Sequence, residues 1–221
     1  MPLPHQPVVE PLGDAAWLVR WPALPSSNQA ALQFARFLSA GRLDLVRDVV
    51  PAYASVAVYF PPGRKTSLRV RQCLLTDLSD LKESGTDPAT VTDVEIPTYY
   101  GGEAGPDLDQ VAEICGLTPP EVIARHSAAL YTVACIGFSP GFPYLTGLPA
   151  ELHLPRRAIP RISVPAGSVA IAGGQAGIYP ASSPGGWHLI GRTQIPLFSP
   201  MEEPPTRLKP GDRVRFVPIS D

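Results

Sequence analysis

The chain of 221 residues is 44% hydrophobic and 17% charged, and its formal net charge at pH 7 is −2. This composition is typical of a globular protein, and the lack of an extended basic face argues against a nucleic-acid partner. Proline occurs 28 times, more than twice its usual share of ~5%, which favours loops and strand ends over long helices.

The N-terminal segment and the cysteines indicate the compartment. The first residues, MPLPHQPVVEPLGD, have neither a positive n-region nor an apolar h-region, and no stretch of about 18 apolar residues follows. We therefore expect a cytoplasmic protein that does not associate with a membrane. Cys73, Cys115 and Cys135 are odd in number and stand among apolar neighbours, so we interpret them as buried hydrophobic side chains rather than as a catalytic thiol.

The first strand and the first helix follow directly in the sequence. Residues 15–21 (AAWLVRW) are rich in strand formers and come after the Gly13-Asp14 turn signal. Residues 26–41 then have apolar positions at helical spacing, a serine-rich start and Gly41 at the end. The pattern predicts a strand and then a helix.

Two further strands, a second helix and a fourth strand complete the first half. Residues 43–50 and 53–60 predict a hairpin joined at Pro51-Ala52. A helical pattern begins at Thr66 and ends before Gly85, and residues 91–100 predict another strand. The order is β-α-β-β-α-β, which is that of a ferredoxin-like α+β domain with two helices on one face of a four-stranded sheet, and we expect it to span residues 1–96.

Two short helices and many short strands make up the second half. Residues 107–115 predict a helix capped by Asp107 and ended by Gly116, and Thr118 begins a second helix with a capping box. From Tyr131 onward the pattern changes to short strands with glycine turns: YTVACIGF, SVAIAG, GIYP, WHLIGRT and, after the turn Lys209-Pro-Gly-Asp212, RVRFVPI. This pattern is typical of a small closed β barrel, expected over residues 97–221.

Five longer segments carry a resemblance to a known family. They are GGEAGPDLDQVA, GFSPGFPYL, PRISVPAGSVAIAGGQAGIYP, SPGGWHLIGRT and LKPGDRVRF, and GDAAWLV near the start extends the match. In order and spacing they resemble the family that contains the B subunit of 5-oxoprolinase and the sporulation kinase inhibitor KipI, also described as allophanate hydrolase subunit 1. The resemblance implies an N-terminal α+β domain followed by a cyclophilin-like β barrel, in agreement with the order of elements above. Cyclophilin-like describes the fold, and prolyl isomerase activity does not follow from it.

The resemblance also implies partners and an activity. Family members act with a second subunit, of the type of KipA or of the 5-oxoprolinase C subunit, and the pair is similar to the two halves of the carboxyltransferase domain of urea carboxylase. In the bacterial 5-oxoprolinase, the A, B and C subunits together open 5-oxoproline to L-glutamate at the expense of ATP, with Mg²⁺ accompanying the nucleotide. Our first hypothesis is therefore the B subunit of this enzyme, inactive as an isolated chain. The alternatives are a KipI-like inhibitor of a histidine kinase and half of a urea or allophanate-type carboxyltransferase.

No set of residues in the sequence makes a self-contained active site. A His-Glu-x-x-His pair and a phosphate loop are missing from the sequence, and the histidines are dispersed: His5, His126, His153 and His188. We therefore expect no bound metal and no flavin in this chain. The catalytic candidates are Arg161, Gln175 and His126.

The candidate substrate contacts lie in the glycine- and proline-rich segments. Arg156 and Arg161 match family arginines, and a guanidinium can hold a carboxylate bidentately, although surface arginine is the alternative. Gln175 and Tyr179 are the preferred ligand contacts. Ser139 and Phe142 in the GFSPGF loop and Ser168 in the VPAGS turn complete the set, with turn capping and barrel packing as the alternatives.

Three further positions bear on this set of candidate contacts. His126 stands at the end of a helix, where the helix dipole favours it, or else points toward the GFSPGF loop. Trp187 packs the barrel or anchors an interface, and we favour the interface with the partner subunit. The family commonly has threonine where this chain has Ala176, so one candidate hydroxyl is missing.

Overall fold

The computed structural model describes residues 6–24, 26–40, 44–83 (side chains to residue 79) and 91–220, and the chain divides into two compact units, Met1–Thr90 and Val91–Asp221. The predicted helix ends at Gly41 and Gly85, and the histidine at position 5, lie outside the described residues. Among the described helices, none has the length and apolar character needed to cross a bilayer.

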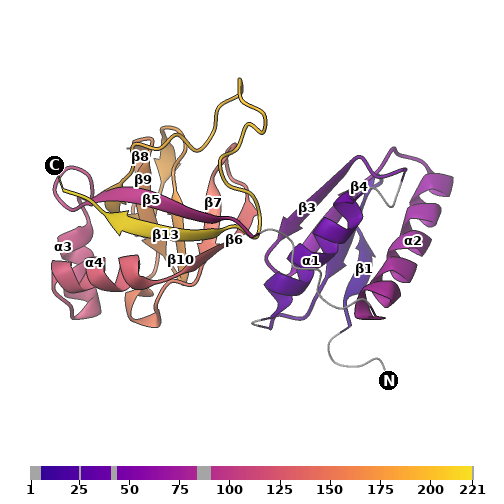
Figure 1. Cartoon of the computed structure of the whole chain (residues 1–221), viewed down its shortest axis with the longest axis horizontal. Coiled ribbons are helices and arrows are strands. Elements are labelled where there is room, and N and C mark those ends of the chain that lie inside the picture. Colours follow the sequence, from indigo (N-terminus) through magenta and orange to yellow (C-terminus); the bar gives the residue numbers. More distant parts are fainter. Residues whose placement is uncertain (1–5, 25, 41–43, 84–90, 221) are drawn as a thin grey trace. The chain divides into compact units, whose positions relative to one another are not determined.

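The first unit is a four-stranded antiparallel sheet with two helices (Figure 1). The strands are arranged in the order β1-β2-β4-β3. In chain order its described elements are β1 (Val8–Pro11), β2 (Ala16–Arg20), α1 (Ser27–Ser39), β3 (Asp48–Ala52), β4 (Ser55–Tyr59) and α2 (Arg64–Glu83).

The ferredoxin-like arrangement is not confirmed. The strand predicted at 91–100 is present as β5 (Asp93–Tyr100), but it pairs with barrel strands of the second unit and not with this sheet. The fourth strand of the sheet is instead β1, so the order is β-β-α-β-β-α. β1 escaped prediction because prolines surround it, whereas Gly13, with φ +69, makes the turn of a β1-β2 hairpin and not merely the start of a strand.

The second hairpin turns two residues later than predicted. β3 begins at Asp48 and continues through Pro51 to Ala52, and the turn is made by Tyr53 and Ala54. Pro51 is tolerated because β3 is an edge strand, where a missing N–H leaves no sheet hydrogen bond unmade. Tyr53 adopts φ +52, a left-handed conformation that its residue type gives no reason to expect.

Apolar residues of both helices pack on one face of this sheet and give the first unit its core. Val19 of β2 pairs with Val56 of β4, so their side chains share that face. The buried cluster comprises Val19, Trp21, Ala31, Phe34, Ala35, Leu38, Val56, Val58, Phe60, Val70, Leu74 and Leu78. The helical spacing of Val70, Leu74 and Leu78, recognised in the sequence, corresponds to this buried face.

The second unit is built around a closed barrel of seven strands, in the order β10-β7-β6-β13-β5-β12-β9, as predicted in outline. Its elements are β5 (Asp93–Tyr100), α3 (Leu108–Cys115), α4 (Pro119–Ala128), β6 (Tyr131–Ile136), β7 (Pro143–Thr146), a 3₁₀ turn (Ala150–Leu152), β8 (Arg161–Val164), β9 (Ser168–Ala172), β10 (Gln175–Ile178), β11 (Ser183–Gly185), β12 (His188–Arg192) and β13 (Arg213–Pro218). The expected division between residues 96 and 97 would cut β5, whereas the chain divides into its two units between residues 90 and 91.

Helices α3 and α4 pack together beside the barrel (Figure 1). Their ends follow the sequence signals: Gly116 takes φ +66 after α3, and Thr118 and Glu121 form the capping box of α4. Asp107 stands at the N-cap position of α3 but its side chain makes no capping hydrogen bond. The Asp107 carboxylate instead pairs with two arginines of the barrel unit.

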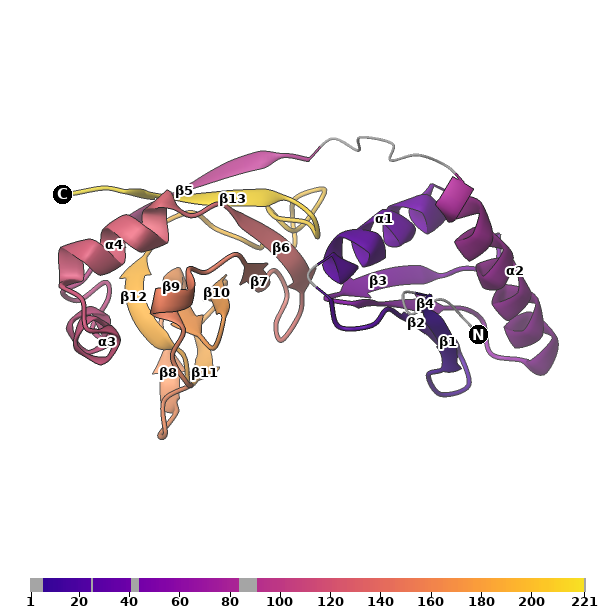
Figure 2. The ribbon, with the colours of Figure 1, turned by 90° about the horizontal axis from the view of Figure 1, so that it is seen from below.

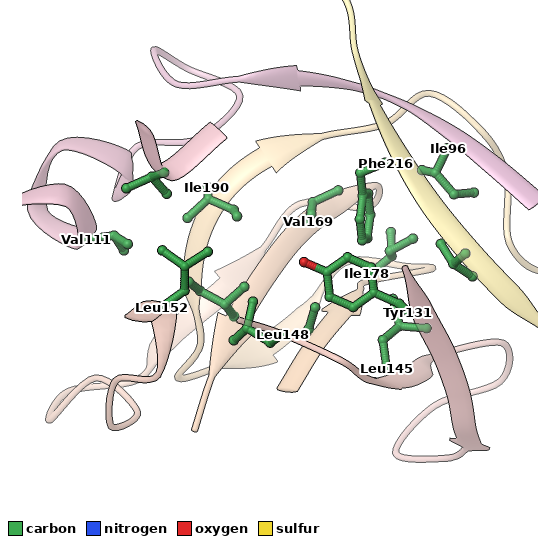
Figure 3. Packing of buried hydrophobic residues seen from close by; sticks show 14 of the residues in the cluster. Ile96, Val111, Tyr131, Leu145, Leu148, Leu152, Val169, Ile178, Ile190 and Phe216 are labelled. Atoms are coloured by element: carbon green, nitrogen blue, oxygen red, sulfur yellow. The ribbon is translucent and has the colours of Figure 1, made fainter. Parts of the chain in front are cut away.

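The barrel interior is filled by apolar side chains. Figure 3 shows Ile96, Tyr131, Val169, Ile178 and Phe216 pointing toward one another from different strands, and Val111 of α3 joins the same cluster. Ile96, Val169 and Ile178 are fully buried. Because the interior is packed, a ligand of this unit has to bind outside the barrel.

Three strands that the sequence did not reveal shape that outer surface. β7 belongs to the barrel, whereas β8 and β11 form a separate two-stranded sheet that extends from it (Figure 2). We call β8, β11 and the segment 155–160 that leads into β8 the arm. The short length of these strands, three or four residues each, explains why their periodicity was too brief to recognise.

Candidate functional site

Five aromatic side chains gather on the outer face of the barrel and define the candidate site. Phe142 lies at the centre, with ring centroids 4.9 Å from Tyr144, 5.2 Å from Tyr179, 5.4 Å from Phe138 and 5.7 Å from Trp187. All four contacts are edge-to-face, the geometry that aromatic pairs favour. We call these five residues the outer aromatic cluster.

Strand alternation places the cluster outside. On β9, Val169 and Ile171 point into the barrel, whereas Ala170 and Ala172 pack with the outer cluster. On β10 the residue that faces outward between two inward side chains is Gly177. A Cβ there would lie 2.8 Å from the Phe142 ring, so glycine is required for the rings to approach the strand.

Phe138 is the exposed member of the cluster. Its side chain is 62% exposed and its backbone adopts φ +66, an uncommon conformation for a bulky residue. The GFSPGF turn imposes it: Ser139 N–H donates to the Gly137 carbonyl, and Phe142 N–H donates to the Ser139 carbonyl. Strained backbone of this kind concentrates at functional sites.

Arg156 brings a positive charge to this surface. Its guanidinium carbon lies 6.0 Å from the centroid of the Trp187 ring, a cation–π contact. Arg156 is exposed, and no ion pair of this residue is found among the described residues. Burial raises the pKa of Tyr179, and the nearby Arg156 charge opposes that rise.

The other two arginines of this region, Arg157 and Arg161, are paired with Asp107. Arg161 donates from both terminal nitrogens to the two carboxylate oxygens, at 2.9 and 2.7 Å, and Arg157 donates to one of them at 2.8 Å. The backbone N–H of Leu189 donates to Asp107 as well, at 2.7 Å. We call these four residues the Asp107 ion cluster.

The carboxylate of Asp107 is held in its charged form. Burial, to 4% exposure, would raise its pKa, but the hydrogen bonds from Arg161 and Leu189 and the charges of Arg161 and Arg157 outweigh burial and lower the pKa below its usual value. Because the fork of Arg161 is occupied by Asp107, Arg156 is the better placed of the two predicted arginines to receive an external anion.

The remaining predicted contacts share the outer face but lie at different points on it. Gln175 begins β10 at its hairpin end, and Tyr179 directly follows the last residue of β10 and is buried in the cluster, at 2% exposure. Ser168 is 2% exposed, and its carbonyl accepts from Tyr179 N–H. Trp187, favoured as an interface anchor, is 5% exposed and sits beneath Arg156 rather than on the surface.

His126 lies away from these residues, inside the aromatic core of the barrel unit. It is fully buried against Tyr131 and Phe216, and its Nδ1 is 2.7 Å from the Tyr100 hydroxyl. Burial lowers the pKa of His126 to about 3, so the imidazole is neutral at physiological pH. It does not point toward the GFSPGF loop.

The cysteines and histidines supply no evident reactive centre in the described part of the chain. Cys135 is buried, and burial raises the pKa of its thiol to about 11; Cys73 and Cys115 are partly buried. Within the residues the structure describes, no group of three or more His, Cys, Asp and Glu could hold a metal ion. The outer face offers an exposed guanidinium and aromatic rings as binding groups.

A broad open groove of about 1210 Å³ lies elsewhere on the barrel unit. It is lined by the segments 99–104, 166–167 and 192–196, with Pro180 and the C-terminal residues 219–220. None of the predicted site residues lines it, and the Nε of its arginine, Arg192, already donates to the Ala166 carbonyl. We favour the outer aromatic cluster because it combines an available cation with apolar rings, the usual composition of a small-molecule site.

Sequence reasoning missed two residues of this site. Asp107 was interpreted only as a helix cap, although an acidic residue in the first family motif and arginines in a later one could have suggested an ion pair. Phe138, in the GFSPGF segment, was interpreted as filling the barrel mouth or an interface rather than as a substrate contact, and the serine-proline-glycine turn after it is the signal that could have indicated its exposure.

The chain matches the family model for the carboxyltransferase domain, subdomains C and D, over residues 7–208. It is 40% identical to the 5-oxoprolinase B subunit of Bacillus subtilis over 225 residues, 96% of this chain and 93% of that protein. It is 57% identical to the 5-oxoprolinase B subunit of Escherichia coli O157:H7 over 125 residues, 57% of each chain. The chain therefore belongs to the carboxyltransferase subdomain C and D family, and within it to the family of 5-oxoprolinase B subunits.

More distant relatives and solved structures agree with this placement. The urea amidolyase of Saccharomyces cerevisiae is 32% identical over 123 residues, 52% of this chain and 7% of that protein. The structure of TTHA0988 superposes with a TM-score of 0.79 at 37% identity over 94% of this chain, which spans 40% of the length of that protein. The Kluyveromyces lactis urea carboxylase, at 19% identity and a TM-score of 0.76, shares the fold.

Proposed function

We propose that this chain is the B subunit of an ATP-dependent 5-oxoprolinase that, with the A and C subunits, hydrolyses 5-oxoproline to L-glutamate. The observation that carries the proposal is the 40% identity to a 5-oxoprolinase B subunit along almost the whole chain. Similarity of that extent includes the outer aromatic cluster and the arm.

The outer aromatic cluster fits the chemistry of 5-oxoproline, a small lactam ring with one carboxylate. Arg156 is exposed above Trp187 and can donate two hydrogen bonds to the carboxylate. Phe138 offers an exposed ring surface for the lactam, Tyr179 supports that ring from beneath at 2% exposure, and the Gln175 amide faces the same side of β10. Ser139, Phe142, Ser168 and Arg161 support this surface.

The reaction requires activation because a lactam carbonyl is a poor electrophile. The γ-phosphoryl group of ATP is transferred to the lactam oxygen, and water then adds to the carbonyl carbon. The ring C–N bond breaks, the nitrogen takes a proton, and γ-glutamyl phosphate forms. A second water hydrolyses this acyl phosphate to glutamate and inorganic phosphate. Charge develops on the transferred group and on the carbonyl oxygen, where guanidinium and backbone N–H donors stabilise it. Mg²⁺ accompanies the nucleotide.

The site is completed by a partner, which we infer to be the C subunit. Three apolar side chains around the arm and the GFSPGF loop are exposed: Phe138 by 62%, Ile159 by 80% and Ile162 by 92%. Exposed apolar side chains next to a binding surface are typical of an interface. The chain covers 40% of the longer TTHA0988 chain, and a composite site of this kind predicts that the isolated chain has no activity. The free cysteines suit a reducing cytoplasm.

The proposal is tested by reconstitution. Purified A, B and C subunits are mixed with ATP, Mg²⁺ and 5-oxoproline, and ADP and glutamate are measured against mixtures that lack B. We expect turnover only with all three subunits. No turnover with the full set, together with tight inhibition of a histidine kinase by this chain, would replace the proposal with a KipI-like regulator.

A second candidate, half of a urea or allophanate-type carboxyltransferase, is favoured by the carboxyltransferase family model and by the shorter urea amidolyase match. It predicts carboxyl transfer between biotin and an amide. An assay of the B and C pair with carboxybiotin and urea separates it, since we expect no carboxylated urea.

A further inference from the structure

The Asp107 ion cluster connects three separate segments of the barrel unit. Asp107 immediately precedes α3, Arg157 and Arg161 come from the arm, and the Leu189 amide comes from β12. The contact with Leu189 is reciprocal, because the N–H of Asp107 donates to the Leu189 carbonyl at 2.9 Å. A single buried carboxylate thus fixes the base of the arm against the barrel.

The residues held by Asp107 are direct neighbours of the proposed substrate contacts. Arg157 follows Arg156, and its N–H donates to the Gly186 carbonyl at 2.8 Å, next to Trp187. Leu189 lies two residues after Trp187. The guanidinium of Arg156 and the indole below it therefore take their relative positions from the segments that Asp107 joins.

The arm is packed onto the cluster at a second point. Gly185 of β11 pairs with Arg161 of β8, and a Cβ on Gly185 would overlap the Tyr179 hydroxyl. Any movement of Arg161 away from Asp107 therefore displaces the strand that lies on Tyr179. The Arg161–Asp107 ion pair and the position of the Tyr179 ring therefore both depend on the pairing of β8 with β11.

Charge gives Asp107 a second effect on Arg156. Three arginines lie within a stretch of six residues, and Asp107 pairs with two of them. With Asp107 neutral, Arg157 and Arg161 lose their partner and become available to bind the same anion in other geometries. With Asp107 charged, Arg156 remains as the guanidinium available to an external carboxylate.

We propose that Asp107 is a positioning residue that holds Arg156 over Trp187 and reserves it for the carboxylate of the substrate. This inference rests on the proposed function. It assigns Asp107 no contact with substrate and no part in proton transfer.

A double-mutant cycle in the reconstituted complex tests the proposal. Asp107→Asn should raise KM for 5-oxoproline about tenfold or more while kcat changes less, the size expected when a charge-assisted hydrogen bond is lost. In an Arg156→Ala background the same substitution should change KM less than about twofold, because there is no Arg156 left to position. An equal KM increase in both backgrounds would overturn the proposal in favour of general structural support.

Two variants serve as matched controls. Asp93 makes a bidentate ion pair with Arg213 on the barrel surface, with 64% of its side chain exposed, so Asp93→Asn removes the same chemistry away from the arm and should leave KM unchanged. Asp107→Glu keeps the charge on a longer side chain and should recover most of the affinity. Should Asp107→Asn not fold, Asp107→Glu still tests the proposal, because a failure of this variant to keep most of the affinity would count against it.

A spectroscopic measurement on the isolated chain separates the proposal from the assigned activity. The indole N–H resonance of Trp187, identified with Trp187→Phe, should shift in Asp107→Asn, whereas those of Trp17 and Trp21 in the first unit should not. A wild-type complex that does not turn over 5-oxoproline refutes the proposed function alone. An unmoved Trp187 resonance refutes the positioning role, whatever the activity.

Discussion

Two aromatic clusters lie in the barrel unit, one inside and one outside, and they differ in access and charge rather than in residue type. The inner cluster consists of Tyr100, His126, Tyr131 and Phe216, and its histidine is fully buried with no cation beside it among the described residues. The outer aromatic cluster has an exposed phenylalanine and an arginine over its tryptophan. A titratable side chain is therefore not enough to identify the site. His126 is a residue type that often acts in catalysis, but here it is buried in the core.

Truncating a phenylalanine to alanine should lower the free energy of unfolding much more in the inner cluster than in the outer aromatic cluster. Phe216 is 1% exposed, and Phe216→Ala should lower the free energy of unfolding by about 3–5 kcal/mol through lost burial and a cavity. Chemical denaturation of the isolated chain measures this. The folded fraction should keep its KM in the complex, and a KM change as large as that of an outer-cluster variant would contradict the division between the clusters.

Acid should destabilise the inner cluster through His126. The unfolded chain protonates this imidazole below about pH 6.5, and the folded chain only near pH 3, so its contribution to stability is complete above pH 6.5 and falls as the pH drops. Between pH 7 and pH 4 the loss should be roughly 3 kcal/mol. His126→Gln should flatten the pH dependence of the unfolding free energy, and a slope equal to that of the wild type would refute the assignment.

Gly177→Ala should disturb the outer cluster from within the barrel wall. Its Cβ would meet the rings of Phe142 and Trp187 at 2.8 and 3.1 Å, and overpacking of this kind costs about 1–3 kcal/mol. The free energy of unfolding should fall and KM should rise, since the rings are part of the proposed site. Gly102→Ala is a control for backbone strain alone, because a Cβ there meets nothing within 4 Å although φ is +52, whereas Gly177 is not among the glycines with positive φ. An unchanged KM in Gly177→Ala would show that the cluster only packs.

Phe138→Ala should have the smallest effect on stability. The ring is 62% exposed, so the free energy of unfolding should change by less than about 0.5 kcal/mol. KM should nevertheless rise several-fold, or the C subunit should bind less tightly, as steady-state kinetics and titration with the C subunit would show. No change in either quantity would remove Phe138 from both site and interface.

Local signals predicted the fold where contacts are local and failed where they are distant. The capping box of Thr118 and the stop at Gly116 depend on adjacent residues and are confirmed. The partners of β5 are β12 and β13, and Asp93 lies opposite Arg213, 120 positions away, so the sequence pattern predicted a strand without its sheet. Because β5 was assigned to the sheet of the first unit, the predicted order was ferredoxin-like.

The candidate site shows the same limit. Arg156 and Arg161 are alike in sequence, and only the fold brings Asp107 to Arg161, 54 positions away. That pairing decides which arginine is available to a ligand. Likewise, the sequence marked His126 as a helix-end residue, but its burial among rings depends on strands that come after it.

The central claim is that Arg156 on the outer aromatic cluster binds the substrate carboxylate, and one pair of constants tests it most directly. In the reconstituted complex, KM for 5-oxoproline and the inhibition constant of 2-pyrrolidone, the same lactam without the carboxylate, are measured for wild type and Arg156→Ala. Arg125→Ala, at a half-buried arginine of α4 that pairs with Glu151, is the control. The account predicts that Arg156→Ala raises KM about 10- to 100-fold and leaves the 2-pyrrolidone constant within about twofold. An unchanged KM, or equal losses for both lactams, would contradict it.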